Sequence, residues 1–159
     1  MKSRYWTIAV AVCALGLAAC EDKKEMAMDP AQAVAQRQDL MKDNGGHAKA
    51  INEFVENGKG TAADVKMHAE ALQANAKRIP TLFPAGTSAD DMPNKSYAKA
   101  DIWARWPDFE KAAYELEEQS EKLAEVADAG DAAAIKAQFT SLGKNACGAC
   151  HQAFRLKKE

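Results

Sequence analysis

Apolar side chains recur at helical spacing in four segments of this 159-residue chain, and this pattern constrains the fold more than any other feature. In the first segment, Val34, Met41, Ala48 and Val55 repeat every seven residues, which places them on one helical face. No segment shows the alternation of apolar and polar residues that is typical of a strand. Two short connections and one long one join the segments, so the sequence predicts an all-α, antiparallel up-down-up-down four-helix bundle. The segments run from residue 30 to about 57, from 61 to 79, from about 107 to 129 and from 131 to 153.

Capping residues and prolines mark where these helices begin and end. Asp29-Pro30 opens the first helix, because aspartate caps an N-terminus and proline at the first helical position loses no hydrogen bond. Thr61 caps the second helix and Pro80 ends it. Residues 80–100 hold three of the five prolines of the chain, so they predict a long connection. Connections of this length in compact domains usually serve a functional site.

The segment Cys147-Gly148-Ala149-Cys150-His151 lies near the end of the fourth predicted helix. Its spacing is the one that covalent attachment of a c-type haem requires, because two thiols can bond the vinyl groups while the adjacent imidazole reaches the iron. We therefore expect one covalently bound haem c per chain, with Cys147 and Cys150 as thioethers, His151 as an iron ligand and the 80–100 connection as a wall beside the haem. A zinc site and a thioredoxin-like thiol pair are the alternatives. The sequence offers neither a second ligand pair nor a strand-helix unit for them.

The first nineteen residues have the pattern of a secretory signal, in which Lys2 and Arg4 precede an apolar run too short to span a membrane. Residues 17–20, Leu-Ala-Ala-Cys, resemble the bacterial lipobox, in which the cysteine is acylated and becomes the first mature residue. We expect a lipoprotein signal peptide over 1–19, a lipid anchor at Cys20, a tether over 20–29 and a periplasmic haem domain over 30–157. If the run ends instead in an ordinary Ala-x-Ala site, the protein is soluble in the periplasm. Cys13 leaves with the signal, so we expect no disulfide.

The charge balance gives no support to nucleic acid as a partner. Removal of residues 1–19 takes Lys2 and Arg4 and no acidic residue, so the net charge changes from -2 to -4. A mildly acidic domain gives no reason to expect nucleic acid as a partner. It favours basic or neutral redox proteins of the periplasm or membrane.

A haem motif at the C-terminal end of an exported four-helix chain resembles the class II c-type cytochromes, the cytochrome c prime family. The resemblance covers about residues 30–157 and is carried by residues 37–42 (RQDLMK), 129–131 (AGD) and 143–155 (GKNACGACHQAFR). It implies a cytochrome domain of two alternative chemistries. In the low-spin branch a methionine from the first helix fills the sixth iron position. In the high-spin branch that position is open and binds nitric oxide or carbon monoxide, and dimers through the first two helices are common.

Met41 occupies the place of that methionine. Residues 40–45 (LMKDNG) and 82–84 (LFP) look more like the low-spin branch. We therefore expect His151 and Met41 on iron, in an electron carrier rather than an enzyme. The five-coordinate gas-binding protein is the alternative, and Met41 is then a core residue of the seven-residue stripe. A helical lipoprotein whose motif holds zinc or serves only structure is a third possibility.

The remaining candidates come from the first, second and last helices. The resemblance places Arg37 near a haem propionate, whereas a solvated surface arginine is the alternative. Gly45-Gly46 would let the first helix approach a flat ring closely, or would kink it. We expect neither His47 nor His68 to bind iron, since lone histidines are usually surface or core residues. Arg155 is expected to order the end of the last helix rather than to contact haem.

Overall fold

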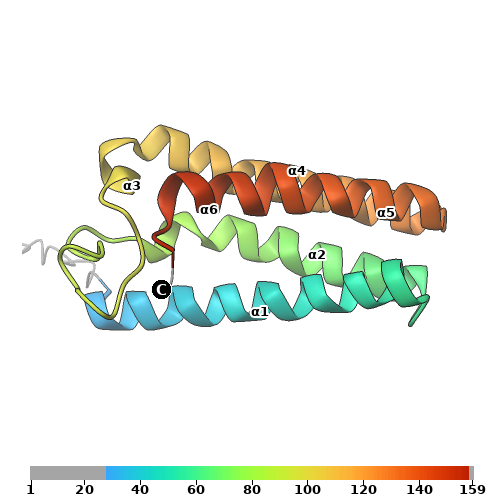
Figure 1. The fold of residues 1–159 in the computed structure, drawn as a ribbon, viewed down its shortest axis with the longest axis horizontal. Coiled ribbons are helices and arrows are strands. Elements are labelled where there is room, and N and C mark those ends of the chain that lie inside the picture. Colours follow the sequence, from blue (N-terminus) through green and yellow to red (C-terminus); the bar gives the residue numbers. More distant parts are fainter. Residues whose placement is uncertain (1–27, 158–159) are drawn as a thin grey trace, which may run out of the picture.

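The structure is a computed structural model in which residues 28–157 are described. Four long helical units run side by side in the order that the sequence predicts, so the all-α four-helix bundle is confirmed (Figure 1). The predicted signal peptide and the predicted lipid anchor at Cys20 lie outside the described residues. The helices are α1 (Pro30–Asn57), α2 (Ala62–Arg78), η1 (Pro80–Leu82), α3 (Asp101–Ala104), α4 (Trp106–Asp128), α5 (Ala132–Ser141), η2 (Leu142–Gly148) and α6 (Ala149–Phe154).

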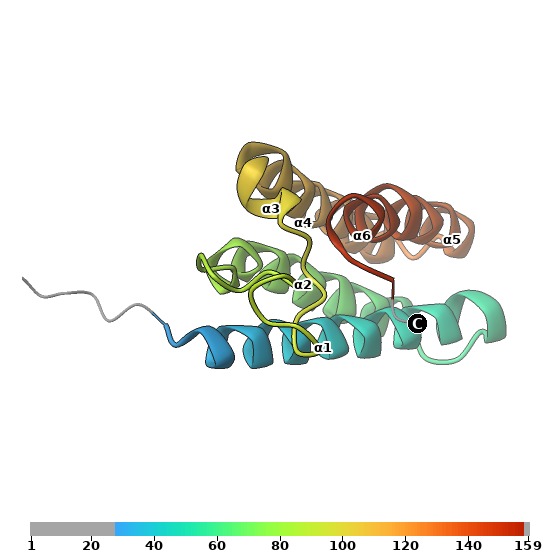
Figure 2. The same ribbon diagram turned by 60° about the vertical axis from the view of Figure 1, so that its left-hand side comes forward.

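The helices are arranged in two layers. Figure 2 shows α1 and α2 in one layer and α4 with α5, η2 and α6 in the other. Across the layers α2 packs chiefly on α4, while α1 packs on α2 and α4 packs on the last helical unit. The connection between η1 and α3 lies at the same end of the bundle as the start of α1 and the end of α6 (Figure 1). No helix within residues 28–157 is long and apolar enough to cross a membrane.

The predicted helix ends are present as local hydrogen bonds and turns. The Asp29 side chain accepts a hydrogen bond from the Gln32 backbone at 3.0 Å at the start of α1. Thr61 and Asp64 form a reciprocal capping box at the start of α2, in which each side chain accepts from the backbone N–H of the other. Gly58 ends α1 at φ 63°, a left-handed conformation that glycine adopts without steric cost.

The core is rich in alanine. Its larger members come from every helix that faces the interior, α1 to α5 and η2. The largest fully buried hydrophobic side chains are Ile51, Val65, Leu72, Ile102, Phe109, Leu123, Ile135 and Leu142.

The last helical unit is not a uniform α-helix. Residues Leu142–Gly148 form a π-helical segment between α5 and α6, which the helical periodicity of the sequence does not predict. A Cβ at Gly148 would lie 3.2 Å from the Gly143 carbonyl oxygen, so this turn is tighter than most side chains accept. Cys147 lies in the π segment, whereas Cys150 and His151 lie in α6. Single π turns inside helices occur frequently at functional sites.

Candidate functional site

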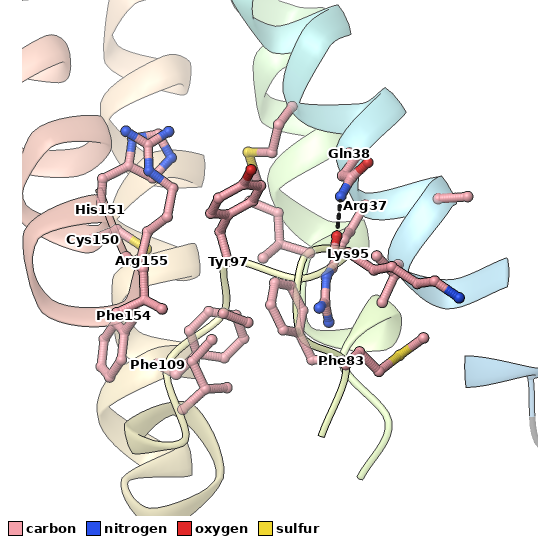
Figure 3. Close-up of a pocket in the computed structure, with 18 of the residues that line it drawn as sticks. Arg37, Gln38, Phe83, Lys95, Tyr97, Phe109, Cys150, His151, Phe154 and Arg155 are labelled. Atoms are coloured by element: carbon pink, nitrogen blue, oxygen red, sulfur yellow. Dashed lines mark hydrogen bonds between the residues drawn. The ribbon is translucent and has the colours of Figure 1, made fainter. Parts of the chain in front are cut away.

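A cavity of about 720 Å³ lies between α1, the connection from η1 to α3, and α6. Figure 3 shows Cys150, His151 and Arg155 on the α6 side, Arg37 and Gln38 on the α1 side, and Tyr97 between them. The connection supplies a wall, which is the role that the sequence predicts for residues 80–100. Its lining residues from that connection are Phe83, Met92, Asn94, Lys95, Tyr97 and Ala98.

The attachment motif borders this cavity. Cys150 and His151 line it directly, and Cys147 is a partly buried residue that packs against the core one turn earlier. Both cysteines are free thiols. Burial raises the pKa of Cys147, and burial together with the neighbouring Cys147 raises the pKa of Cys150 to about 11. Reactive thiol pairs depend on a lowered pKa, so these thiols are unlike those of a thioredoxin-type redox site.

The zinc alternative lacks a ligand set in the part of the chain that the structure describes. Within residues 28–157, no three His, Cys, Asp or Glu side chains group closely enough to hold a metal ion. A structural zinc site needs four such ligands.

His151 is prepared to act as a metal ligand. Burial, and to a lesser degree the positive charge of Arg155, lowers the pKa of His151 below its usual value. The imidazole is therefore neutral at pH 7, which is the form that binds metals. Arg155, which we expected only to order the helix end, lies in the cavity wall beside His151 (Figure 3).

The opposite wall of the cavity comes from α1. Met41 is partly buried, packs against the core and lines the same cavity as His151. Val34, four residues before Gln38 and seven before Met41, lines it as well. Met41 and His151 therefore face one space from two helices, as ligation on both sides of a haem requires.

Arg37 is a buried cation in this wall. Only 5% of the residue is exposed, and the guanidinium lies 4.7 Å from the centre of the Phe83 ring. Nη1 donates to Thr87 Oγ1 at 2.9 Å, and Nη2 donates to the Thr87 carbonyl oxygen and to Ser96 Oγ at 2.6 Å each. Burial lowers the pKa of Arg37 to about 10.

All three of these acceptors are neutral oxygens, and no carboxylate within residues 28–157 forms an ion pair with Arg37. A buried guanidinium without an anionic partner is costly. The structure thus excludes the alternative of a solvated arginine, while the propionate contact stays a prediction that this missing anion supports.

Aromatic side chains pack together at one end of the cavity. Phe109 packs on Phe83, Trp106 and Phe154 with ring centres 4.7, 5.5 and 5.5 Å apart. Trp103 Nε1 donates to the Phe83 carbonyl oxygen at 3.0 Å and so fixes the connection. The spacing of aromatic residues around Pro107 does not reveal which of them meet, because the contacts span 20 to 45 residues of chain.

Polar side chains close the rim of the cavity. Gln38 Nε2 donates to the Lys95 carbonyl oxygen at 2.7 Å and ties α1 to the connection (Figure 3). Lys99 donates to the carbonyl oxygens of Gln152 and Ala153 and ties the connection to α6. The connection is therefore fastened to both helices that face the cavity.

Four residues considered from the sequence are not part of this cavity. His47 and His68 do not line it, and neither do Gly45 and Gly46. α1 continues without a break through both glycines, and a Cβ at either position would meet no atom within 4 Å. The structure therefore supports neither a close approach of these glycines to a ring nor a helix break at them.

The residues present fit a covalently bound haem. The cavity is apolar over most of its wall, two thiols and a neutral imidazole stand at one side, and a buried cation without an anion stands at the other. Two thioethers would fix the haem edge, His151 would supply one axial ligand and Arg37 could neutralise a carboxylate of the haem.

Known proteins share this fold. The family model described as Cytochrome C' matches residues 32–155. A cytochrome c' from Pararhodospirillum photometricum is 32% identical over 126 residues, which cover 79% of this chain and 98% of that protein. A solved cytochrome c' with a ligand-controlled dimer dissociation aligns at 30% identity with a TM-score of 0.74, over 82% of this chain and 98% of that one. Cytochrome c' structures from Alcaligenes xylosoxidans with bound carbon monoxide or nitric oxide align at 27% identity with TM-scores of 0.71, over 82% and 98%.

Proposed function

The chain belongs to the cytochrome c' family, and from that premise we propose that its haem binds nitric oxide or carbon monoxide on the face turned towards α1. The family carries covalently bound haem c, and Cys147, Cys150 and His151 fit the attachment motif. The comparisons favour this gas-binding alternative over the His/Met electron carrier that the sequence led us to expect, because related structures hold these gases. The haem iron supplies the binding site for the gas when the group is attached.

The observation that carries the proposal is that α6 and α1 bound the same cavity from two sides. His151 would hold the iron from the α6 side. The side chains of α1, with Phe83 and Tyr97 from the connection, then decide what reaches the other face. A mostly apolar, partly enclosed wall of this kind admits a small neutral gas more readily than a large ligand.

Met41 supports a second candidate function, because its side chain lines the same cavity as His151. If the thioether binds iron, both axial positions are filled and the protein carries single electrons with little rearrangement. Thioether sulfur favours the ferrous state, so this ligand set raises the reduction potential. Neither candidate requires the protein to turn over a substrate.

Optical spectra of the ferrous haem protein, with and without carbon monoxide, separate the two candidates. Gas binding predicts high-spin bands before addition and fast, complete binding of the gas. A low-spin spectrum that carbon monoxide does not change would contradict the proposal and favour Met41 as a ligand. Met41→Ala should leave the spectrum unchanged if the α1 face is open. Met92→Ala is the matched control, since Met92 lines the cavity from the connection instead of α1.

We further propose that the mature protein is held at a membrane of the periplasm by lipid on Cys20, where redox partners or gas reach it. Palmitate labelling of cells that express the chain tests this location. Label that persists in a Cys20→Ala variant would contradict the anchor. If pyridine treatment reveals no covalent haem, the haem site itself is contradicted and the zinc site becomes the alternative to test.

A further inference from the structure

Two histidines meet between α1 and α2, away from the haem cavity. His47 Nδ1 and His68 Nδ1 lie 2.9 Å apart, and the ring centres are 5.2 Å apart with the planes inclined by 52°. The His47 side chain is only 23% exposed. One unprotonated ring nitrogen must accept in this contact, because two N–H groups cannot face each other at this distance.

A carboxylate and a buried amide stand behind this pair. His47 Nε2, the nitrogen on the far side of the ring, lies 3.4 Å from Asp43 Oδ2. Asn75, of which 6% is exposed, donates to the same oxygen at 2.7 Å and to Asn44 Oδ1 at 2.9 Å. The negative charge of Asp43 favours the His47 tautomer with its proton on Nε2, and in that tautomer the unprotonated Nδ1 lies on the side of His68.

We propose that His47 and His68 form a binding site for a divalent transition metal ion, with Cu²⁺ as the best fit. A carboxylate beside the second ring nitrogen favours one tautomer of a metal-binding histidine, and Asp43 lies 3.4 Å from that nitrogen of His47. Imidazole nitrogen suits copper, nickel and zinc. The site shares no residue with the haem cavity.

The distance between the two nitrogens selects among these metals. With metal–nitrogen bonds of about 2.0–2.1 Å, nitrogens 2.9 Å apart subtend about 90° at the metal. This is the angle between neighbouring ligands of a tetragonal Cu²⁺ or Ni²⁺ site. A tetrahedral Zn²⁺ would need the nitrogens about 3.3 Å apart at the same bond lengths, so the helices or rings would have to separate.

Water completes the coordination. The two nitrogens are the only ligands that the cluster supplies directly, since no group of three metal-ligating side chains is found within residues 28–157. A small cavity of about 290 Å³ adjoins His68 and is lined by the carboxylates of Glu53 and Asp64. These acidic groups attract a cation to the entrance, and Lys59 on the same wall opposes them.

Binding requires both Nδ1 atoms to be unprotonated. His68 meets this condition when its ring proton is on Nε2 instead of Nδ1. The charged groups facing the pair are Asp43 on α1 and Asp64 on α2.

Titration calorimetry of the chelator-treated, haem-loaded protein with Cu²⁺ tests the site, and electron paramagnetic resonance reports the nitrogens bound to copper. We expect one equivalent of Cu²⁺ on two nitrogens, with an unchanged haem absorption band. His47→Gln and His68→Gln should each lower the affinity at least about tenfold, and Asp43→Asn by about 10- to 100-fold. Asp39→Asn, an exposed carboxylate one turn before Asp43 that pairs with Lys42, is the matched control and should change nothing.

Circular dichroism verifies that each variant is folded. Equal Cu²⁺ affinity in the wild type and in the His47→Gln/His68→Gln double variant would overturn the proposal, as would a copper signal without nitrogen coupling. If a histidine variant does not fold, the Asp43→Asn and Asp39→Asn pair decides, because equal affinity in these two proteins contradicts the arrangement. Failure of carbon monoxide to bind the haem would leave this result untouched.

Discussion

Replacement of the buried Arg37 by Met is the most informative perturbation of the haem cavity. Methionine fills similar space and removes the charge together with three hydrogen bonds. Hydrogen bonds from a charged donor contribute about 1.5–3 kcal/mol each, so their gross loss is roughly 5 kcal/mol at the lower limit. The acceptors keep other partners, because Ser96 Oγ donates to the Thr87 carbonyl oxygen and accepts from the Ala98 N–H. Loss of the three hydrogen bonds from Arg37 therefore leaves no buried oxygen without a hydrogen bond.

Relief of the buried charge offsets much of this loss. The lowering of the Arg37 pKa to about 10 corresponds to a cost of roughly 3 kcal/mol for keeping the guanidinium charged in this environment. With the hydrogen bonds taken at their lower limit, the difference predicts that Arg37→Met lowers the free energy of unfolding by about 1–2 kcal/mol when no anion pairs with Arg37. If a haem propionate does pair with it, breaking a buried ion pair raises the loss to about 3–5 kcal/mol.

Denaturant unfolding of the haem-loaded protein, followed by circular dichroism and by the haem band, measures this quantity. Lys42→Met is the control, since Lys42 lies on the same helix with a side chain 76% exposed and should change the stability by less than about 0.5 kcal/mol. A loss for Arg37→Met no larger than that of the control would refute the reasoning. It would mean that the contacts of Arg37 with the connection contribute nothing net.

Three further predictions concern the helices, the connection and the haem. Gly45→Ala and Gly46→Ala should each raise the free energy of unfolding by about 0.5–1 kcal/mol, because both positions are helical with open space for a methyl group. Thermal melting measures this change, and a loss of stability would contradict the prediction. Hydrogen bonds from Ser88 lower the pKa of Asp91 below its ordinary 3.8, so its carboxylate stabilises the connection at neutral pH and this contribution is lost as the pH falls through and below that value. Asp91→Asn should therefore flatten the acid limb of the stability profile, and an identical profile would exclude this role. A Cys147→Ala/Cys150→Ala variant should lose covalent haem and melt at a lower temperature with less cooperativity, because the cavity of about 720 Å³ is left unfilled. If this variant melts as sharply and at as high a temperature as the haem protein, the bundle packs without haem.

The sequence predicted the helices well because their signals are local. The capping box at Thr61, the left-handed Gly58 and the break at Pro80 each depend on a few neighbouring residues. The attachment motif is local too, since all three of its functional residues lie within five positions. Its likeness to the family therefore predicted the haem and the residues that hold it.

The interior of the site could not be predicted in the same way, because it depends on contacts between distant segments. Arg37 meets Thr87 and Ser96 across 50 and 59 residues, and nothing in the first helix distinguishes it from an exposed arginine. His47 and His68 looked like separate spare imidazoles until the packing of α1 on α2 brought their nitrogens together. For Met41 the sequence and the comparisons favour different chemistries, and only its place in the cavity wall is common to both.

The π-helical segment Leu142–Gly148 makes the orientation of the haem motif depend on residue count. In an α-helix each residue turns the chain by about 100°, so loss of one residue between α5 and α6 would rotate everything after it by that angle about the helix axis. Cys150 and His151 would then face a neighbouring helix or solvent instead of α1. The π-helical segment thus sets the angle between the buried side of α5 and the side of α6 that carries the haem motif. Insertions or deletions are therefore tolerable in the loops of this bundle but not in these seven residues.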